Sequence, residues 1–459
     1  MNAIARKADT IVKKDIYERP LLVPHQLGMM NKMGSAQARA PLTEIDGVAV
    51  EELVACYGSP LFVFSERALV RRYRELRDAL TRRYPKVRIA WSYKTNYLDG
   101  ICRVFHREGA WAEVVSEFEY DKALHLGVAP ERIHFNGPLK GESALEKALP
   151  AGSIVHIDHF DELRLAERVA ERRGCRPKVA LRINLQAGAL PAWSRFGFNL
   201  ESGQARDAVM RIVTGGKLEL TGLHCHIGTF VLDPAGYRVA AQKLAQLANE
   251  IRARFGVELS FIDVGGGFAS QNTLKAMYMP GEQASPSFAQ YAEAIAAGLS
   301  ELDAPPRRQP TLVVETGRAL VDEAGHLITT VQAEKRLADG RRAIVADAGV
   351  NVLFTAFWYK HDVLPAQPSS GTPEATVIYG PLCMNIDVMR DSVLLPPLDV
   401  GDRLVFRHVG AYNVTQWMQF ITYRPAVVII GRDGRHGLLR RREDLQTILA
   451  QEEVPAWLR

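Results

Sequence analysis

The sequence predicts an α/β fold, in which a TIM-like (β/α)8 barrel is followed by a mostly antiparallel C-terminal β-domain. Eight short apolar segments alternate with helical segments between residues 87 and 315. After about residue 320, short strands separated by Gly, Pro and Asp follow one another with few helices between them. Parallel strands require crossovers of this kind, and eight βα units make a barrel of about 250 residues. An open doubly wound sheet shows the same alternation, so the pattern alone leaves that arrangement open.

The barrel elements follow in order from residue 65. Helical periodicity, with Ser65 as the N-cap before Glu66, predicts a helix over 65–84. The predicted barrel strands are 87–93, 111–115, 132–136, 153–158, 178–184, 218–227, 259–265 and 311–315. Helices are predicted between most of these strands, among them 160–172, 237–254 and 287–302.

Four parts are predicted along the chain. They are an N-terminal extension over 1–40, a region over 41–64 whose strand at 60–64 contributes to the β-domain, the barrel over 65–320, and the β-domain over 321–459. A chain of 459 residues exceeds what one hydrophobic core usually supports, which agrees with two domains. The strands of the β-domain are expected at 326–336, 342–349, 375–380, 403–410 and 426–430.

The composition argues against several classes of protein. The net charge of +5 is spread along the chain with no basic run between aromatic residues, so nucleic acid is not an expected partner. No stretch reaches about 18 uninterrupted apolar residues, and the N-terminus lacks the apolar core of a signal peptide, so no membrane span is expected. The five cysteines are widely spaced with no CxxC pair, which argues against a disulfide framework or a zinc site and favours the cytoplasm.

Polar residues gather where the predicted barrel strands end. The carboxyl ends of barrel strands lie on one face of the barrel, where catalysis takes place. The residues at these ends are Lys94 after the first strand, His224 and His226 at the sixth, Gly265 to Gly267 after the seventh, and Glu315 followed by Thr316, Gly317 and Arg318 at the eighth. A random distribution would divide such residues between the two faces, so the sequence predicts an active site here.

Lys94 is the central candidate of this site. A surface lysine is the alternative, but a lysine buried at the mouth of a barrel would have a lowered pKa, and its neutral amine can form a Schiff base. The glycine triplet is either a flexible turn or a phosphate site, because barrels often bind phosphate after strand seven. A lysine together with a phosphate site indicates pyridoxal phosphate, and Glu315 is the candidate partner of its pyridine nitrogen.

Two further side chains have alternative interpretations. His226 is either a core histidine or an imidazole stacked on the cofactor ring, and a metal site with His224 is not expected because no third ligand is close in sequence. Cys383, in "GPLCMNID", is either a small buried apolar residue or a thiol that supplies a proton to a carbanion.

Seven segments together resemble one known family. They are "SYKTN", "EVVSEFE", "HCHIGT", "DVGGGF", "ETGRALV", "GPLC…D" and "GAYN". In this order they resemble the fold-type III pyridoxal-phosphate decarboxylases, the diaminopimelate and ornithine decarboxylase group, over roughly residues 45–440. The resemblance implies an alanine racemase-like barrel with a β-domain, and an amino-acid decarboxylase that uses pyridoxal 5'-phosphate.

The resemblance also implies a role for each matching residue. Lys94 binds the cofactor covalently, His226 stacks on its ring and Glu315 pairs with the pyridinium. The phosphate contacts are Thr229 in place of a usual serine, Gly266, Gly267, Gly317, Arg318 and Tyr412. Cys383 comes from the second subunit and returns a proton to the α-carbon, which implies a homodimer with shared active sites.

Several departures from the family pattern affect the expected substrate. Thr316 stands where the family has proline, Met384 where it has an acid, and Thr355 in the segment where diaminopimelate decarboxylases carry an arginine. We therefore expect a siderophore or antibiotic intermediate rather than meso-diaminopimelate. The candidate substrate contacts are Arg318, Asp347, Tyr359, Met384 and Asp387. The alternatives are a diaminopimelate decarboxylase of lysine biosynthesis, an amino-acid racemase, and a non-catalytic cofactor-binding protein.

Overall fold

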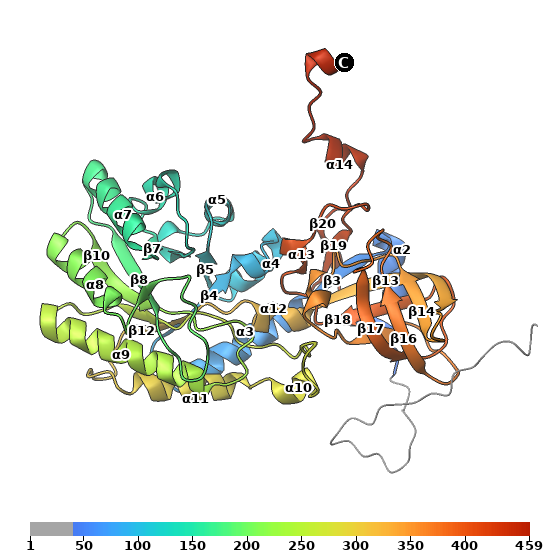
Figure 1. Ribbon diagram of the computed structural model, residues 1–459, viewed down its shortest axis with the longest axis horizontal. Helices are drawn as coiled ribbons and strands as arrows, with labels where there is room; N and C mark the ends of the chain where they lie inside the picture. The colour runs from blue at the N-terminus through green and yellow to red at the C-terminus, as the bar shows by residue number, and fades with distance from the viewer. Residues whose placement is uncertain (1–39) are drawn as a thin grey trace, which may run out of the picture.

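A closed barrel of eight parallel strands forms the first domain of the computed structural model, which describes residues 40–459 (Figure 1). Its strands are β4 (Val87–Ser92), β5 (Trp111–Val114), β6 (Ile133–Phe135), β7 (Ile154–Ile157), β8 (Lys178–Asn184), β10 (Glu219–His224), β11 (Phe261–Asp263) and β12 (Thr311–Val314). Because β10 pairs with both β8 and β11, and β12 returns to β4, no open edge remains among these eight. The predicted barrel is confirmed, and the open doubly wound sheet is excluded.

The barrel strands form where the sequence has short, continuously apolar runs. Parallel strands that are covered on both faces have continuously apolar sequences, because neither face meets water. The helices around them are α3 (Glu66–Thr81), α4 (Asp99–Arg107), α5 (Glu117–His125), α6 (Glu142–Ala148), α7 (Phe160–Arg173), α8 (Gln204–Gly215), α9 (Ala235–Phe255) and α11 (Phe288–Leu299). The Ser65 hydroxyl accepts a hydrogen bond from the Ala68 backbone N–H, which is the N-cap expected for α3.

The second domain is a mixed, mostly antiparallel sheet. Its strands are β3 (Leu61–Ser65), β13 (Gly325–Arg336), β14 (Arg342–Ala346), β15 (Val363–Pro365), β16 (Glu374–Tyr379), β17 (Val388–Leu395), β18 (Arg403–Arg407), β19 (Ala426–Ile430) and β20 (His436–Arg440). The pairs β14–β16 and β3–β19 are parallel, and the remaining pairs are antiparallel. Figure 1 shows this domain beside the barrel, with β3 among the C-terminal strands.

Strand β3 precedes the barrel in the chain but lies in the second domain. It pairs with β13 on one side and with β19 on the other. The residues of the predicted N-terminal extension lie outside the described part of the chain, except for residue 40. Among residues 40–459, no helix is both long and apolar enough to cross a bilayer. All five cysteines are free thiols.

Candidate active site

Lys94 lies directly after β4, in the short 3-10 turn η1 (Tyr93–Thr95), and contacts an acid from the next strand. Its Nζ is 2.8 Å from Oε2 and 3.0 Å from Oε1 of Glu113. Glu113 is 1% exposed, whereas the Lys94 side chain keeps 39% of its surface exposed. The register of β4 on β5 explains the contact, because Ser92 stands opposite Glu113 and donates a hydrogen bond to it.

The predicted lowering of the Lys94 pKa is wrong. Burial alone would lower it, but the charge of Glu113 and its hydrogen bond, with a further contribution from the charge of Glu315, raise the pKa of Lys94 above its ordinary value. Lys94 therefore carries a proton, and Glu113 is the group that faces it. Sequence reasoning missed Glu113, although a signal existed: it is the only acid inside the apolar segment "WAEVV".

Glu119 lies behind this pair, on the first turn of α5. Its Oε2 accepts a hydrogen bond of 2.8 Å from the backbone N–H of Val115, and the residue is 6% exposed. Burial raises the pKa of Glu119 from 4.5 to about 7, and the charge of Glu113 adds to this effect. Between these two values the folded protein holds a proton that the unfolded chain has released, so this group lowers stability as the pH rises.

The Glu119→Gln substitution is expected to remove this pH dependence. The variant should gain stability relative to the wild type by about 1.4 kcal/mol per pH unit across the window from 4.5 to 7. Urea unfolding at several pH values measures the difference, and Glu131→Gln at an exposed position is the matched control. Parallel stability profiles of the variant and the wild type would contradict the assignment.

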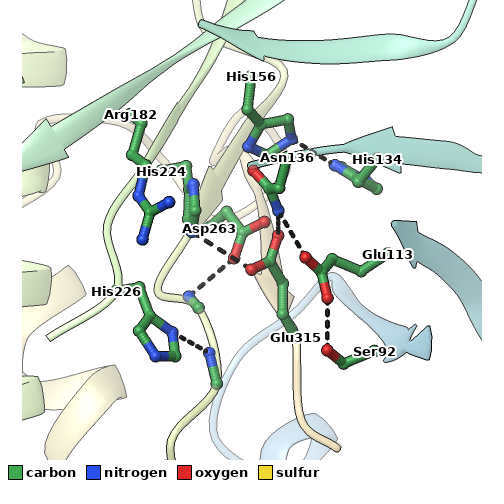
Figure 2. Close-up of polar contacts among 12 residues, drawn as sticks. Ser92, Glu113, His134, Asn136, His156, Arg182, His224, His226, Asp263 and Glu315 are labelled. Carbon is green, nitrogen blue, oxygen red and sulfur yellow. Dashed lines mark hydrogen bonds and ion pairs between the residues drawn. The ribbon is translucent and has the colours of Figure 1, made fainter. Parts of the chain in front are cut away.

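Glu315 follows β12 and lies inside a group of buried polar side chains at the barrel centre (Figure 2). Its Oε1 accepts a hydrogen bond from Asn136, and its Oε2 is 3.3 Å from Nε2 of His224. Burial would raise the pKa of Glu315, but the neighbouring His224 and His156 hold it well below its ordinary value. Glu315 is therefore a buried carboxylate, as a partner of a protonated ring nitrogen must be.

His226 contacts a different set of residues from His224. The Nδ1 of His226 accepts a hydrogen bond of 3.1 Å from the backbone N–H of Gly266, and its ring lies 5.3 Å from that of Trp193. Burial, together with the charges of Arg182 and Lys94, lowers the pKa of His226 to about 3. The ring is thus a neutral imidazole, and its contact with Gly266 holds it at the edge of the site.

The glycines after β11 are required by close backbone contacts. A Cβ at Gly266 would lie 2.2 Å from the carbonyl oxygen of Glu315. Gly267 has a φ of +93°, and a Cβ there would lie 2.2 Å from the carbonyl oxygen of Gly228. Only glycine allows this turn to pack so tightly at the strand ends. The Gly266 N–H is occupied by His226 in this structure, so its predicted phosphate contact stays a prediction.

The other predicted phosphate contacts lie close together. Arg318 donates a hydrogen bond of 3.4 Å to the Thr229 hydroxyl, donates another to the Tyr359 hydroxyl, and its guanidinium lies 4.6 Å from the centre of the Tyr412 ring. The backbone N–H of Tyr412 donates to the carbonyl oxygen of Thr95 at 2.9 Å, next to Lys94. Segments from four distant parts of the sequence thus meet beside the lysine.

Gly317 has a packing role at the same point. A Cβ at this position would lie 2.0 Å from Oγ1 of Thr95. The absence of a side chain lets the start of α12 (Arg318–Val321) approach the lysine turn and brings Arg318 into the site. Its predicted role in cofactor binding stays a prediction.

The remaining candidates lie in the β-domain. Cys383 is exposed in the loop between β16 and β17, and Met384 is half-buried against the main core. Asp387 is buried, and its carboxylate accepts hydrogen bonds of 2.8 Å from the N–H groups of Val350 and Leu382. These contacts anchor the cysteine loop within its own chain, and the substrate roles of Met384 and Asp387 stay predictions.

The other two proposed substrate contacts are occupied within the chain. Asp347 accepts a hydrogen bond of 2.9 Å from the Thr330 N–H, in the sheet of the β-domain. Tyr359 is buried, and its hydroxyl accepts a hydrogen bond from Arg318. Both positions stay predictions as substrate contacts.

These residues form a donor set that fits pyridoxal phosphate. Arg318, Thr229 and Tyr412 offer a cation and hydroxyl donors for a phosphate, Lys94 offers an amine for a carbonyl carbon, and Glu315 offers a carboxylate for a ring nitrogen. A barrel with this set at its strand ends is typical of enzymes that use this cofactor.

Comparisons with known proteins agree with this class. The family model of the pyridoxal-dependent decarboxylases, pyridoxal binding domain, matches residues 66–322. The chain therefore belongs to the pyridoxal-dependent decarboxylase family. It is a carboxy-lyase with pyridoxal phosphate as its cofactor.

Three relatives describe the similarity further. The chain is 30% identical over 427 residues to the diaminopimelate decarboxylase of Methanothermobacter thermautotrophicus, covering 90% of this chain and 96% of that one. The solved diaminopimelate decarboxylase of M. jannaschii is 27% identical with a TM-score of 0.83, covering 92% and 98% of the two chains. The Helicobacter pylori enzyme solved with L-lysine is 27% identical with a TM-score of 0.77, covering 87% and 98%.

Proposed function

We propose that the enzyme removes the α-carboxylate of diaminopimelate. The observation that supports the chemistry is the meeting of Lys94, Glu113, Glu315 and Arg318 at the barrel strand ends. Full-length similarity to diaminopimelate decarboxylases supports the substrate and favours this alternative over the expected siderophore or antibiotic intermediate.

The bound cofactor supplies an electron sink for the α-carbon that loses CO2. Lys94 holds the cofactor through its amine, and Glu113, 2.8 Å away, accepts the proton that this amine must lose. Glu315 keeps its charge for the ring nitrogen, while His226 packs against the ring as a neutral imidazole. Arg318, Thr229 and Tyr412 hold the phosphate. Each of these roles is part of the proposal.

A carboxylate at the ring nitrogen favours decarboxylation over racemisation. In racemases of this fold an arginine usually faces the ring nitrogen, whereas our proposal assigns that position to Glu315, which has His224 beside it. The β-domain and the cysteine motif around Cys383 likewise argue against a non-catalytic cofactor carrier.

One observation favours a second candidate, a larger amino-acid conjugate. Thr355 is buried, and its hydroxyl contacts Nε2 of His361 at 2.8 Å and Oδ1 of Asn413 at 3.0 Å. Its neighbours Phe354 and Trp358 form an aromatic pair with ring centres 5.3 Å apart. This segment offers an apolar wall where a distal carboxylate would need a cation.

Release of CO2 from a panel of amino acids tests both candidates. The panel contains the stereoisomers of diaminopimelate together with lysine, ornithine, arginine, glutamate and citryl-linked diamino acids. Release from diaminopimelate, at least about tenfold faster than from lysine, is the expected result. Release confined to a conjugate would overturn the proposed substrate and leave the decarboxylase class intact.

Cys383 is proposed to act in the active site of a partner subunit. The side chain is exposed on its loop, and this loop is anchored by Asp387 rather than by the barrel of its own chain. We infer a homodimer in which this thiol returns a proton to the α-carbon of the neighbouring site.

Mixing of two inactive variants is expected to restore activity. Lys94→Ala removes the cofactor link of one subunit, and Cys383→Ala removes the proton donor of the other. A mixed dimer retains one complete site, so up to about a quarter of wild-type activity should return after subunit exchange. The Cys175→Ala variant, at a half-buried position outside the site, is the matched control. No recovery despite proven exchange would contradict shared sites.

A further inference from the structure

The interior of the barrel beneath Glu315 is polar, which is unusual for a core that is commonly filled by branched apolar side chains. We call His156, His224, Asp263 and Glu315 the Glu315 cluster. All four are buried, and one ring nitrogen or carboxylate oxygen from each lies within 4.8 Å of those of the others. They come from β7, β10, β11 and the end of β12, so four neighbouring or near-neighbouring strands converge there (Figure 2).

The two carboxyl groups of the cluster have different environments. Asp263 Oδ1 accepts a hydrogen bond of 2.8 Å from the Gly265 N–H, whereas Oδ2 has no hydrogen-bond partner among residues 40–459. Glu315 is contacted by Asn136 and His224 instead. Two buried carboxylates at this separation cannot both be ionised without a large cost, so one of them must hold a proton.

Burial and the neighbouring charges decide whether Asp263 or Glu315 holds the proton. Burial and the charge of Glu315 raise the pKa of Asp263 well above its ordinary value, while Glu315 stays below its own. The further groups around the pair are Arg88 from β4, Glu113 from β5, His134 from β6, Arg182 from β8 and Lys94. Of these groups, the negatively charged Glu113 raises the pKa of Asp263 further, so it also favours a protonated Asp263.

We propose that Asp263 is a neutral carboxylic acid and that it acts with His224 as a positioning residue, which holds Glu315 as the carboxylate facing the cofactor ring nitrogen. The second half of this proposal rests on the proposed role of Glu315; the protonation of Asp263 does not. The arrangement gives the second acid a use: a protonated Asp263 Oδ2, which has no other partner among residues 40–459, can donate a hydrogen bond that stabilises the charged form of Glu315.

Infrared spectra of the protein without cofactor test the protonation. At pH 9, where Glu119 has released its proton, the spectrum of the wild type minus that of Asp263→Asn should contain the carbonyl stretch of a buried carboxylic acid. The Thr221→Val variant, at a buried position on the same strand as His224, is the control and should keep the band. A spectrum without the band would overturn the proposal, as would one equivalent of a tightly bound divalent cation in the purified protein, since the spacing of the cluster also suits a cation.

The protonation state of the ring nitrogen of bound pyridoxal phosphate reports whether Asp263 and His224 keep Glu315 charged. With the ring nitrogen labelled with 15N, its NMR shift should report a protonated nitrogen in the wild type and in Asp263→Asn, because the amide still donates. Asp263→Leu and His224→Leu should shift it toward the unprotonated value, and kcat should fall by about tenfold or more. A merely structural role would lower the melting temperature and leave the nitrogen shift unchanged.

The infrared spectra and the 15N shift test the protonation of Asp263 and the role of Glu315 independently. If Glu315→Gln leaves the nitrogen shift unchanged, the proposed role of Glu315 fails, while the infrared band still decides the protonation of Asp263. If the leucine variants do not fold, the comparison of the wild type with Asp263→Asn remains decisive, because the amide has nearly the same shape as the acid.

Discussion

The Lys94→Ala variant is expected to lose the visible absorbance of the bound cofactor and to decarboxylate at least about a thousandfold more slowly than the wild type. The amine that joins the cofactor is gone, and Glu113 is left as a buried acid without its cation at 2.8 Å. Absorbance spectra and CO2 release under saturating cofactor measure the two effects.

Lys86→Ala is the matched control for this prediction. Lys86 lies just before β4, at the opposite end of the same strand, and donates hydrogen bonds to the carbonyl oxygens of Arg307 and Gln309. Its loss should leave the spectrum and the rate unchanged. A Lys94→Ala protein with the wild-type spectrum would show that another amine holds the cofactor.

The Arg318→Met variant is expected to bind pyridoxal phosphate about a hundredfold more weakly. Hydrogen bonds to charged groups contribute about 1.5–3 kcal/mol each, and the substitution removes the cation next to Thr229 and Tyr412. The cofactor affinity of Arg318→Lys should lie between those of the wild type and Arg318→Met, because lysine keeps the charge without the planar guanidinium. Titration of the protein with cofactor, followed by absorbance, gives the dissociation constants.

Arg407→Met provides the control for a lost arginine. Arg407 forms an ion pair of 3.0 Å with Asp362 in the β-domain. Its removal should change thermal stability without changing the affinity for the cofactor. If Arg318→Met binds the cofactor as tightly as the wild type, the role of Arg318 is to hold Tyr359 rather than the phosphate.

The barrel was predictable because its strands are buried on both faces. Several of the apolar runs, such as 178–184, end at a polar residue, and the eight runs coincide with the observed strands to within a few residues. Strand β17 was not predicted, because Arg390, Asp391 and Ser392 interrupt its apolar pattern on a partly exposed edge. There the sheet tolerates polar residues on its open side, and periodicity gives a weak signal.

The polar interior of the site was only partly predictable. Lys94 and Glu315 stand at the ends of strands, where sequence alone marks them. Glu113, His156 and Asp263 lie within strands, and their meeting depends on register between neighbouring strands, which the one-dimensional pattern does not contain. The raised pKa of Lys94 was missed for the same reason, since its partner is 19 residues away in the chain.

Strand β3 has a consequence for how the protein is made. It is synthesised before the barrel, yet its neighbour β19 is among the last strands to leave the ribosome. Until then Leu61, Phe62, Val63 and Phe64, which are fully buried in the finished sheet, lack one of their two partners. The nascent chain therefore carries an apolar strand that is unpaired while the barrel is completed and half-paired from the synthesis of β13 until that of β19, and such strands are where aggregation begins. Chaperone demand should thus last until the final stage of translation, and a barrel fragment for separate study should start at residue 66 rather than at 41.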